Sequence, residues 1–409
     1  MNLPHLDMNA TAAGTWRTTD EKASPGESER LIVAGASARA AACSARRAHF
    51  APHAVDHFSD VDLIACCPAL RVRNLRAEMV SALRACPEGA WMYTGPIENY
   101  PDLVAIASRD RPLYGNTEQA LREVRDPWRV VQCLRRAGVP CPDLHPECGV
   151  APPGTWLRKP LRSGGGRGIV RLHGTRAIDR VACPVIPPGS THYLQRAVPG
   201  KPCSAVFAAA AGQAALLGVT QQLVGCRWAN ASLFGYAGSL TWPTVTQDQL
   251  VQFQRIGEAL AREFALVGLF GVDAVANTRG VWPVEINPRY TASVELLERA
   301  TGVQAVAVHA AACRDHRLPQ SATPPTTHCL GKAVIYARRQ IVVGPAFHDF
   351  VARENTNQDW PRIADVPASG ERLVAGQPLV TVFAAGESTA DVRRRLRRFA
   401  HAVHAVAIS

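Results

Sequence analysis

The stretch GLFGVDAVANTRGVWPVEINPR, residues 268–289, is the most informative part of this chain for its fold. Two apolar, strand-like runs flank the turn sequence at 277–280, which predicts a β-hairpin. A hairpin of this length brings Asp273 and Glu285 close together, although twelve positions separate them in the sequence. Glu285 and Asn287 are two positions apart, so they point to the same face of the sheet.

These side chains have the chemistry of a metal site. Oxygen ligands from Asp273, Glu285 and Asn287 suit a hard cation such as Mg²⁺, which completes its shell with water and phosphate oxygens. Mn²⁺ is an alternative with a similar oxygen preference. Arg289 lies just beyond the strand, where its fork can reach a phosphate or carboxylate. The alternative interpretation is a solvated hairpin whose polar residues face water.

A glycine-rich segment favours the functional interpretation. In TWLRKPLRSGGGRGIVRL, residues 155–172, a strand carrying Lys159 runs into a loop and then into a second strand. The loop glycines are Gly164, Gly165, Gly166 and Gly168. Glycines allow backbone N–H groups to approach phosphate oxygens, and a lysine adds a point charge. The loop joins strand to strand without a following helix, which argues against a Walker loop and a dinucleotide-binding fingerprint.

A third segment, THYLQRAVPGKPCSAVF at 191–207, predicts a strand that ends near Gln195, a short turn, and a strand from Ser204. With this order of segments, the chain from about residue 31 onward resembles the ATP-grasp superfamily, in its branch of predicted ATP-dependent carboligases related to biotin carboxylase. Further motifs that carry the resemblance are 33–40, Gly95–Asn99, Pro112–Asn116, Lys159–Pro160, Glu285–Arg289 and Ile363–Pro378.

The resemblance implies roles for individual residues. Lys159 would contact the phosphates of ATP, and the loop from Gly164 to Gly168 would close over them. The segment from Gln195 through Arg196 to Val198 matches the linker that reads the adenine edge, with Ser204 near the ribose. Asp273, Glu285 and Asn287 match the Mg²⁺ ligands. Arg289 matches the arginine near the transferred phosphate, so Lys159 and Arg289 are the expected catalytic residues.

Two positions depart from the pattern of this family. Many relatives carry Asp-Lys at the start of the grasp region, where this chain reads Arg125-Asp126-Pro127-Trp128, so a second phosphate-binding lysine is missing. Gln195 is followed by Arg196 where an acidic residue is frequent, so the side-chain contacts to adenine are expected to differ from those of the family.

The length of 409 residues exceeds one compact domain. We expect an α/β protein with the ATP-grasp fold, in four parts: a disordered leader at 1–30, a Rossmann-like pre-ATP-grasp domain at 31–117, the nucleotide-binding ATP-grasp domain at 118–317, and a small β-rich C-terminal subdomain at 318–409. Strands are predicted at 30–35, 61–65 and 91–95, and helices at 37–48, 127–138, 248–264 and 293–301.

The net charge of +11 raises the question of nucleic-acid binding. The basic run 393–398 has a simpler interpretation as the solvated face of a helix. Its buried stripe would consist of Val392, Leu396, Phe399 and Val403. No nucleic-acid motif accompanies the charge, so no nucleic-acid partner is expected.

Other sequence features indicate a cytoplasmic enzyme. No run approaches eighteen apolar residues, so no membrane span is predicted, and the leader lacks the apolar region of a signal peptide. The twelve dispersed cysteines contain no C-x-x-C and are expected to be reduced thiols. A homodimer is compatible with the sequence.

Some candidate positions keep two interpretations. The turn Gly35–Arg39 either holds an anionic substrate or starts a helix. Glu98 and Asn99 are candidates for the substrate site or belong to a surface turn. Glu295 and Glu298 are either solvated or orient Arg289.

The function expected from this resemblance is an Mg-ATP-dependent ligase. It would phosphorylate a small-molecule carboxylate to an acyl phosphate, from which an amine or another nucleophile displaces phosphate. The branch includes members associated with one-carbon cofactors such as tetrahydromethanopterin or methanofuran-like compounds. Alternatives are a carboxylase that uses bicarbonate, an ATP-binding sensor or scaffold without ligase chemistry, and a nucleic-acid binder.

Overall fold

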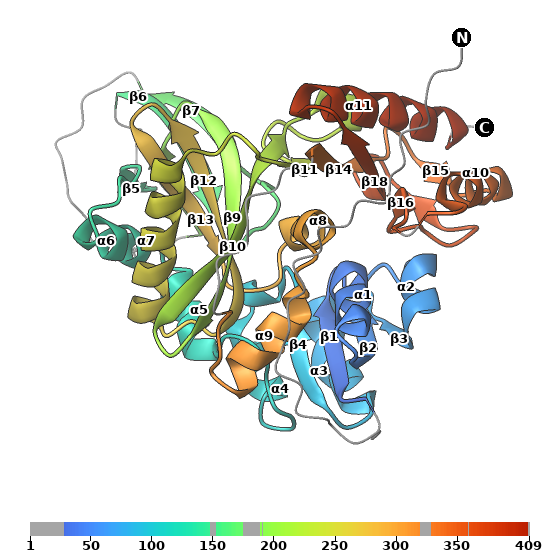
Figure 1. Ribbon diagram of the computed structural model, residues 1–409, viewed down its shortest axis with the longest axis horizontal. Coiled ribbons are helices and arrows are strands. Elements are labelled where there is room, and N and C mark those ends of the chain that lie inside the picture. The colour runs from blue at the N-terminus through green and yellow to red at the C-terminus, as the bar shows by residue number, and fades with distance from the viewer. Residues whose placement is uncertain are drawn as a thin grey trace, which may run out of the picture.

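The computed structural model describes residues 28–147, 153–174, 189, 191–319, 329–358 and 360–407. Nearly all of the leader expected at 1–30 and most of the Pro-rich segment after residue 318 therefore lie outside the described residues. The described chain forms a mixed α/β fold with an N-terminal parallel sheet, a small antiparallel sheet and a large eight-stranded sheet (Figure 1).

The N-terminal domain is a parallel four-stranded sheet in the order β3-β2-β1-β4. Its elements are β1 (Arg30–Gly35), α1 (Arg39–Arg47), β2 (Ala51–Asp56), α2 (Val61–Cys66), β3 (Ala69–Arg71), α3 (Leu75–Ala85), β4 (Ala90–Tyr93), the 3-10 turn η1 (Ile97–Asn99) and α4 (Pro101–Ala107). The connections are helical, as the alternating pattern predicted.

The strand predicted at 61–65 is wrong, because these residues form helix α2. Only Leu63 of this short run is buried, so it presents one side to the protein rather than filling a sheet. The second strand is instead Ala51–Asp56, whose last three residues are all buried. A short apolar run cannot be assigned to helix or strand by periodicity alone.

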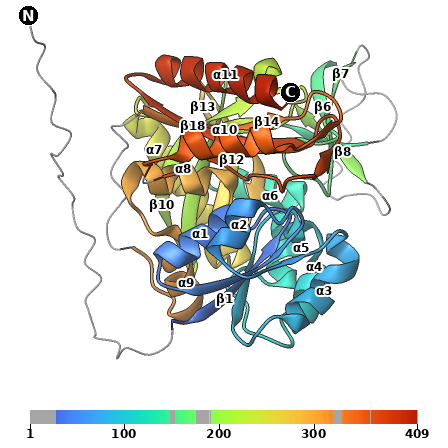
Figure 2. The same cartoon turned by 90° about the vertical axis from the view of Figure 1, so that its right-hand side faces the viewer.

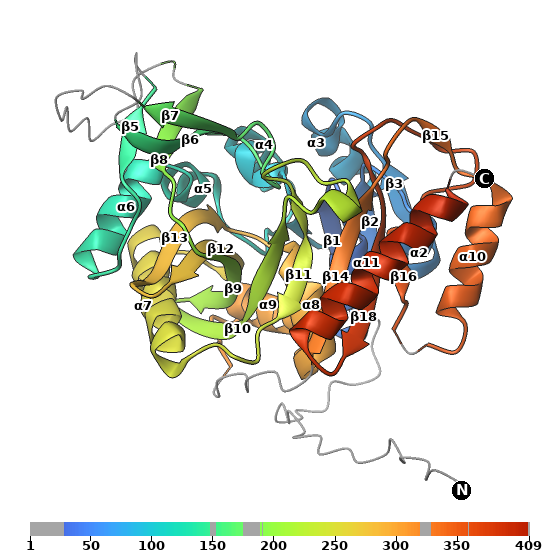
Figure 3. The same ribbon diagram turned by 90° about the horizontal axis from the view of Figure 1, so that it is seen from above.

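The small antiparallel sheet has the order β5-β8-β6-β7. Its strands are β5 (Leu144–Pro146), β6 (Gly154–Pro160), β7 (Val170–Gly174) and β8 (His192–Arg196), preceded by helices α5 (Glu118–Val124) and α6 (Pro127–Arg136). The sheet lies at the opposite end of the molecule from helices α10 and α11 (Figure 1 and Figure 3).

The eight-stranded sheet has the order β13-β12-β9-β10-β11-β14-β18-β16. Its strands are β9 (Lys201–Ala210), β10 (Gln213–Val224), β11 (Tyr236–Thr241), β12 (Gly268–Asn277), β13 (Gly280–Asn287), β14 (Cys329–Tyr336), β16 (Ile363–Ala364) and β18 (Pro378–Gly386). The sheet continues across the boundary expected at residue 318, because β14, β18 and β16 extend the sheet formed by the strands before it. The short strands β15 (Ile341–Val342) and β17 (Arg372–Leu373) pair separately.

Helices cover both faces of the large sheet. Helix α7 (Gln247–Phe264) buries Phe253, Ile256, Leu260 and Phe264 in the cluster that contains Phe207 and Phe270. Residues one position away in the strands, such as Val206 and Leu269, face α8 (Ala292–Thr301) and α9 (Ala305–Arg314). This alternation of neighbouring side chains follows from the two-residue period of a strand.

The C-terminal helices pack on the far end of this sheet. Helix α10 (Pro345–Asn355) and helix α11 (Thr389–Val406) share a core with β14 and β18. Val392, Leu396, Phe399 and Val403 are buried as predicted, so the stripe of α11 is confirmed. None of the helices in the described ranges is both long and apolar enough to cross a membrane.

A buried ionic cluster joins the N-terminal domain to the rest of the molecule, where α1 packs beside α8 (Figure 2). The guanidinium of Arg39 donates to Glu295 and, at 2.8 Å, to Asp365 Oδ1. Lys332 Nζ donates to Glu295 Oε2 at 2.9 Å. Burial alone would raise the pKa of Glu295, but Arg39 and Lys332 hold it well below its usual range.

This cluster decides two interpretations left open by the sequence. Arg39 is occupied by carboxylates, and the backbone N–H of Ala38 donates to Asp56 at 2.6 Å, so Gly35–Arg39 is a helix start. Glu295 is buried and contacts Arg39 rather than Arg289, and Glu298 accepts from Ser44. Both expectations for these glutamates, solvation and orientation of Arg289, are therefore wrong.

Candidate active site

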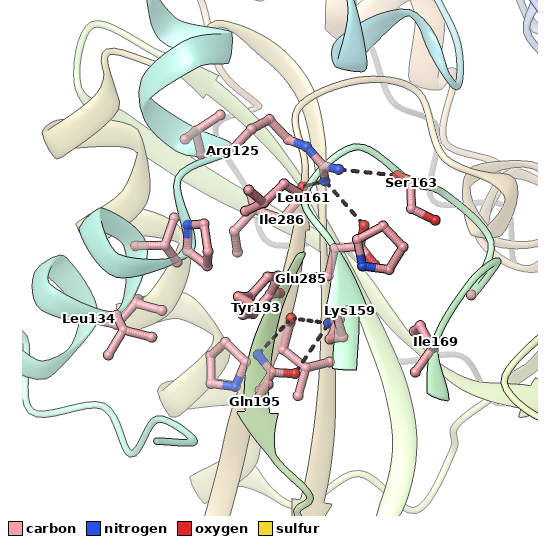
Figure 4. A pocket seen from close by; sticks show the side chains of 18 residues that line it. Arg125, Leu134, Lys159, Leu161, Ser163, Ile169, Tyr193, Gln195, Glu285 and Ile286 are labelled. Atoms are coloured by element: carbon pink, nitrogen blue, oxygen red, sulfur yellow. Dashed lines mark hydrogen bonds and ion pairs between the residues drawn. The ribbon is translucent and has the colours of Figure 1, made fainter. Parts of the chain in front are cut away.

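A narrow cleft separates the small sheet from the edge strand β13 of the large sheet (Figure 4). Its lining comes from helices α5 and α6, strand β6, the glycine-rich loop, strand β8 and strand β13; representative residues are Val124, Pro127, Leu134, Leu161, Ile169, Tyr193 and Ile286. The cavity volume is about 60 Å³, which holds a few water molecules. The cleft is therefore narrow in this conformation.

The predicted hairpin positions the metal-ligand candidates. Asp273 and Glu285 are direct cross-strand partners in the β12–β13 ladder. Asn287 Nδ2 donates to Asp273 Oδ2 at 3.2 Å, and Gln222 Nε2 from β10 donates to the other oxygen, Oδ1, at 2.8 Å. All three predicted ligands thus lie together, and Gln222 is an additional residue that the sequence analysis missed.

The charges in this hairpin favour a cation. Burial and the neighbouring Glu285 carboxylate raise the pKa of Asp273 to about 6. Burial would also raise the pKa of Glu285, but Arg125 and Lys159 hold it below its ordinary value. The repulsion within this half-buried pair of cross-strand carboxylates would be relieved by a divalent ion, so the donor chemistry fits Mg²⁺.

The protein offers too few ligands here to fill the coordination shell of a metal ion by itself. No group of three or more His, Cys, Asp or Glu side chains suited to a metal occurs among the described residues. Asp273 and Glu285 supply two carboxylates, and the amide of Asn287 supplies the third donor. Such a site suits an ion that shares its shell with phosphate oxygens.

Lys159 and Gln195 lie side by side on neighbouring strands of the small sheet (Figure 4). Lys159 Nζ donates to Gln195 Oε1 at 3.2 Å and to the carbonyl of Val284 at 2.9 Å. Gln195 Nε2 donates to the same carbonyl at 3.2 Å. The lysine is buried in the cleft and bonded only to neutral oxygens in these contacts, so its charge is available to a phosphate.

The glycine-rich loop docks on the segment before β11. The backbone N–H of Tyr236 donates to the carbonyl of Gly165 at 3.1 Å. Gly166 has a φ of +78° and packs so closely on Phe234 that a Cβ atom would lie 1.8 Å from its carbonyl oxygen. Glycine is therefore required at this position for both its backbone conformation and its size.

Arg289 enters the site from the loop after β13. Its Nε donates to Glu98 Oε1 at 2.8 Å, and its Nη2 donates to Asn287 Oδ1 at 3.2 Å. Gly95 makes room for this guanidinium, since a Cβ there would lie 3.0 Å from its central carbon. Glu98 is buried in η1, so it belongs to the wall of the site rather than to a surface turn.

Other predicted nucleotide contacts lie elsewhere. Arg196 donates to the carbonyl of Pro153 at 2.7 Å and stacks over Trp156. Neither Arg196 nor Val198 is among the residues that line the cleft. Ser204 is the β9 partner of Asp273 and hydrogen-bonds to that carboxylate, so it lies with the metal-ligand candidates. The assignments of Arg196 and Val198 to adenine, and of Ser204 to ribose, remain predictions.

Arg125 is a second residue that the sequence analysis did not assign. Its side chain reaches from the end of α5 into the space between the glycine-rich loop and Glu285 (Figure 4). Nη1 donates to Glu285 Oε1 at 3.1 Å, and Nη2 donates to the carbonyl of Ser163 at 3.1 Å. The absence of a lysine at Pro127 therefore does not leave this side of the cleft without a cation.

The comparisons with known proteins agree with this geometry. Residues 124–293 match a family model described as an ATP-grasp domain. The chain thus carries an ATP-grasp domain, and the superfamily resemblance seen in its motifs is confirmed. No curated protein sequence gives a significant match to the chain.

Solved structures show the same fold at low sequence identity. A pyruvate carboxylase from Rhizobium etli matches 91% of this chain with a TM-score of 0.65 and 13% identity, and this chain spans 37% of its length. A second match is the biotin carboxylase domain of the Hydrogenobacter thermophilus 2-oxoglutarate carboxylase, solved with MgADP, ADP and bicarbonate. The match covers 90% of this chain and 89% of that domain, with a TM-score of 0.65 and 15% identity. A third match is an L-amino acid ligase from Bacillus licheniformis, which covers 91% of this chain and 97% of the ligase chain, with a TM-score of 0.65 and 11% identity.

Proposed function

We propose that this protein is an ATP-dependent ligase that activates a small-molecule carboxylate as an acyl phosphate and joins it to an amine. The observation that carries the proposal is the clustering of two cations and two carboxylates at the cleft of an ATP-grasp domain. Lys159 and Glu285 line this cleft. Asp273 pairs with Glu285 across the strands, and Arg289 joins Asp273 through hydrogen bonds to Asn287. Phosphoryl transfer requires cationic side chains that stabilise the phosphate charge and oxygen ligands that hold a metal ion beside them.

The reaction would proceed in two displacements. A carboxylate oxygen of the substrate attacks the γ-phosphorus of ATP, and the bond to the leaving oxygen of ADP breaks. The amine then attacks the acyl carbon, phosphate leaves with the bonding electrons, and the nitrogen loses a proton to give the amide. Little covalent chemistry falls on the protein, which must align the groups and stabilise negative charge.

Residues of this chain divide that work. Asp273, Glu285 and Asn287 would hold Mg²⁺, which neutralises phosphate charge when it is bound. Lys159 and Arg289 would contact phosphate oxygens from two sides of the cleft. The glycine-rich loop would exclude water, since an acyl phosphate exposed to water is hydrolysed.

Glu98 offers a way to position the second substrate. Its Oε1 accepts from Arg289, while its buried Oε2 has no hydrogen-bond partner among the described residues. A buried unpaired carboxylate oxygen favours a donor such as an amine. We therefore assign Glu98 to the amine side of the proposed reaction.

The relatives of this fold support ligase chemistry by their names. They include an L-amino acid ligase and a biotin carboxylase domain in complex with MgADP and bicarbonate. We place the reaction in the cytoplasm, with a monomer or homodimer as the active form. One-carbon cofactor precursors belong to the substrate panel because of the family resemblance alone.

The proposal is tested by measuring ADP and phosphate release with Mg-ATP over a panel of carboxylic acids, each with and without amines. Product masses identify the amide. Acid-dependent ADP release with an amide product supports the proposal. ADP release that depends on bicarbonate would instead identify a carboxylase, and ATP binding without turnover over the whole panel would favour the sensor alternative. Salt-dependent DNA or RNA binding without ATP turnover would indicate the nucleic-acid binder.

A further inference from the structure

Arg125 connects three parts of the molecule at the cleft. Its Nη1 donates to Glu285 Oε1 and to the carbonyl of Ile286, both at 3.1 Å, on the metal-binding strand. Its Nη2 donates to the carbonyl of Ser163, at the start of the glycine-rich loop, at 3.1 Å, and to Asn99 Oδ1 of the N-terminal domain at 3.0 Å. The guanidinium serves four acceptors at once, one more than the three N–H donors of a lysine ammonium could serve.

The guanidinium is also incompletely satisfied. Its Nε is buried and has no hydrogen-bond partner among the residues that the structure describes. Burial works against the charged form, yet the carboxylates of Glu285 and Glu98 raise the pKa of Arg125, so the group stays charged. A buried charged donor without a partner favours an additional anionic acceptor in the cleft.

Metal binding changes the partners that Arg125 can keep. A cation held by Glu285 would compete with Arg125 for Oε1 of that carboxylate. An outward movement of the loop that begins at Ser163 would widen the cavity of the cleft and break the contact of Arg125 with the Ser163 carbonyl. With these two contacts given up, the guanidinium would have N–H groups free for the phosphate oxygens of Mg-ATP.

We propose that Arg125 is a nucleotide-positioning residue that exchanges Glu285 for the terminal phosphates of ATP. In the nucleotide-free protein it holds the carboxylate and the loop together. In the complex it supplies the phosphate-binding cation that the chain lacks at Pro127. This inference rests on the proposed function, because it needs Mg-ATP in the cleft.

The two halves of the exchange make opposite predictions for the variant Arg125→Met. Loss of the guanidinium removes a charge-assisted contact to the terminal phosphates, so the affinity for Mg-ATP should fall about tenfold or more while the affinity for AMP stays within about twofold. The affinity for Mn²⁺ alone should rise, because Glu285 no longer has a competing cation.

The experiment is calorimetric titration of the full chain with AMP, ADP and ATP in the presence of Mg²⁺, and of the nucleotide-free protein with Mn²⁺ alone. Arg122→Met is the matched control, since Arg122 lies on the same helix and pairs with Glu118 at the exposed surface. Arg125→Lys keeps the charge without the fork, so its loss of ATP affinity should lie between those of wild type and Arg125→Met.

Each outcome is decisive. An unchanged ratio of ATP to AMP affinity in Arg125→Met would overturn the inference, as would a lower Mn²⁺ affinity, which indicates a purely structural role. If Arg125→Met does not fold, a wild-type affinity ratio in Arg125→Lys together with wild-type Mn²⁺ binding overturns it. If the wild-type protein binds no nucleotide, the proposed function is refuted as well. If wild type and Arg125→Met bind Mg-ATP with the same affinity, only this inference is refuted.

Discussion

Substitution of the loop glycines by alanine tests how the glycine-rich loop is held. Among the described residues, none lies close to the place of a Cβ atom at Gly164 or Gly165. The two positions differ in backbone conformation, because Gly165 has a φ of +62° and Gly164 does not have a positive φ. Gly166 has a φ of +78° and also contacts a neighbour. These three positions therefore separate backbone conformation from steric fit within one loop.

The expected costs follow from these environments. Alanine at Gly164 should leave docking unchanged. Alanine at Gly165 places a side chain in the left-handed region, which costs about 1 kcal/mol and lowers the docked fraction about fivefold. Alanine at Gly166 adds a contact of 1.8 Å with the carbonyl oxygen of Phe234, which only a shift of backbone can relieve. We expect about 3 kcal/mol in total, or about a hundredfold.

Limited trypsin digestion measures docking without any assumption about activity. Arg162 and Arg167 flank the three glycines, so an undocked loop is cut faster after these residues, and peptide masses identify the cuts. Cleavage rates should rise in the order Gly164→Ala, Gly165→Ala, Gly166→Ala, with thermal unfolding as a control for the fold. Equal rates in all three variants would refute the docking of the loop on Phe234.

Four further predictions concern the charges of the molecule. Glu285→Ala should abolish Mg²⁺-dependent ATP turnover and leave the circular dichroism spectrum unchanged; residual turnover at the wild-type rate would contradict the metal assignment. Lys159→Ala should weaken Mg-ATP binding about tenfold or more by calorimetry, and wild-type affinity would exclude its phosphate role. Because the pKa of Asp273 is raised to about 6, the folded state holds this proton more tightly than the unfolded state, so the stability of the metal-free protein should fall as the pH rises from about 4 to about 6. Urea unfolding at pH 5 and pH 7 checks this, and Asp273→Asn should reduce the difference; an equal difference in the variant would contradict the assignment. Glu295→Gln leaves Arg39 and Lys332 without a shared carboxylate and should cost about 3 kcal/mol in urea unfolding, whereas Glu371→Gln at the surface should cost less than about 1 kcal/mol; equal losses would contradict the weight given to the buried cluster.

Local patterns predicted the hairpin of β12 and β13 that carries the metal-ligand candidates. Asp273 and Glu285 are joined by one short turn, so strand alternation and turn chemistry were sufficient to bring them together. The same holds for the buried stripe of α11, which depends only on helical spacing. The resemblance to ATP-grasp proteins supplied the order of the segments and the place of Lys159 in the cleft.

Contacts between distant segments were not predictable in this way. Gln222 reaches Asp273 from another strand, and Arg125 reaches Glu285 across 160 positions. Gln222 reaches the site because β10 and β12 both pair with β9 in the large sheet, and Arg125 reaches it from the end of helix α5. Neither arrangement can be predicted from local spacing. The same reason explains Glu295, whose partners Arg39 and Lys332 come from regions before and after it in the chain.

The transfer of oxygen from the acid to phosphate tests the central claim most directly. The protein is supplied with Mg-ATP, an amine and a carboxylic acid labelled with ¹⁸O in its carboxylate, and the released phosphate is analysed by mass spectrometry. An acyl phosphate requires that one labelled oxygen per turnover appear in the phosphate and that the nucleotide product be ADP. Amide formation with unlabelled phosphate, or with release of AMP and pyrophosphate, would contradict the account.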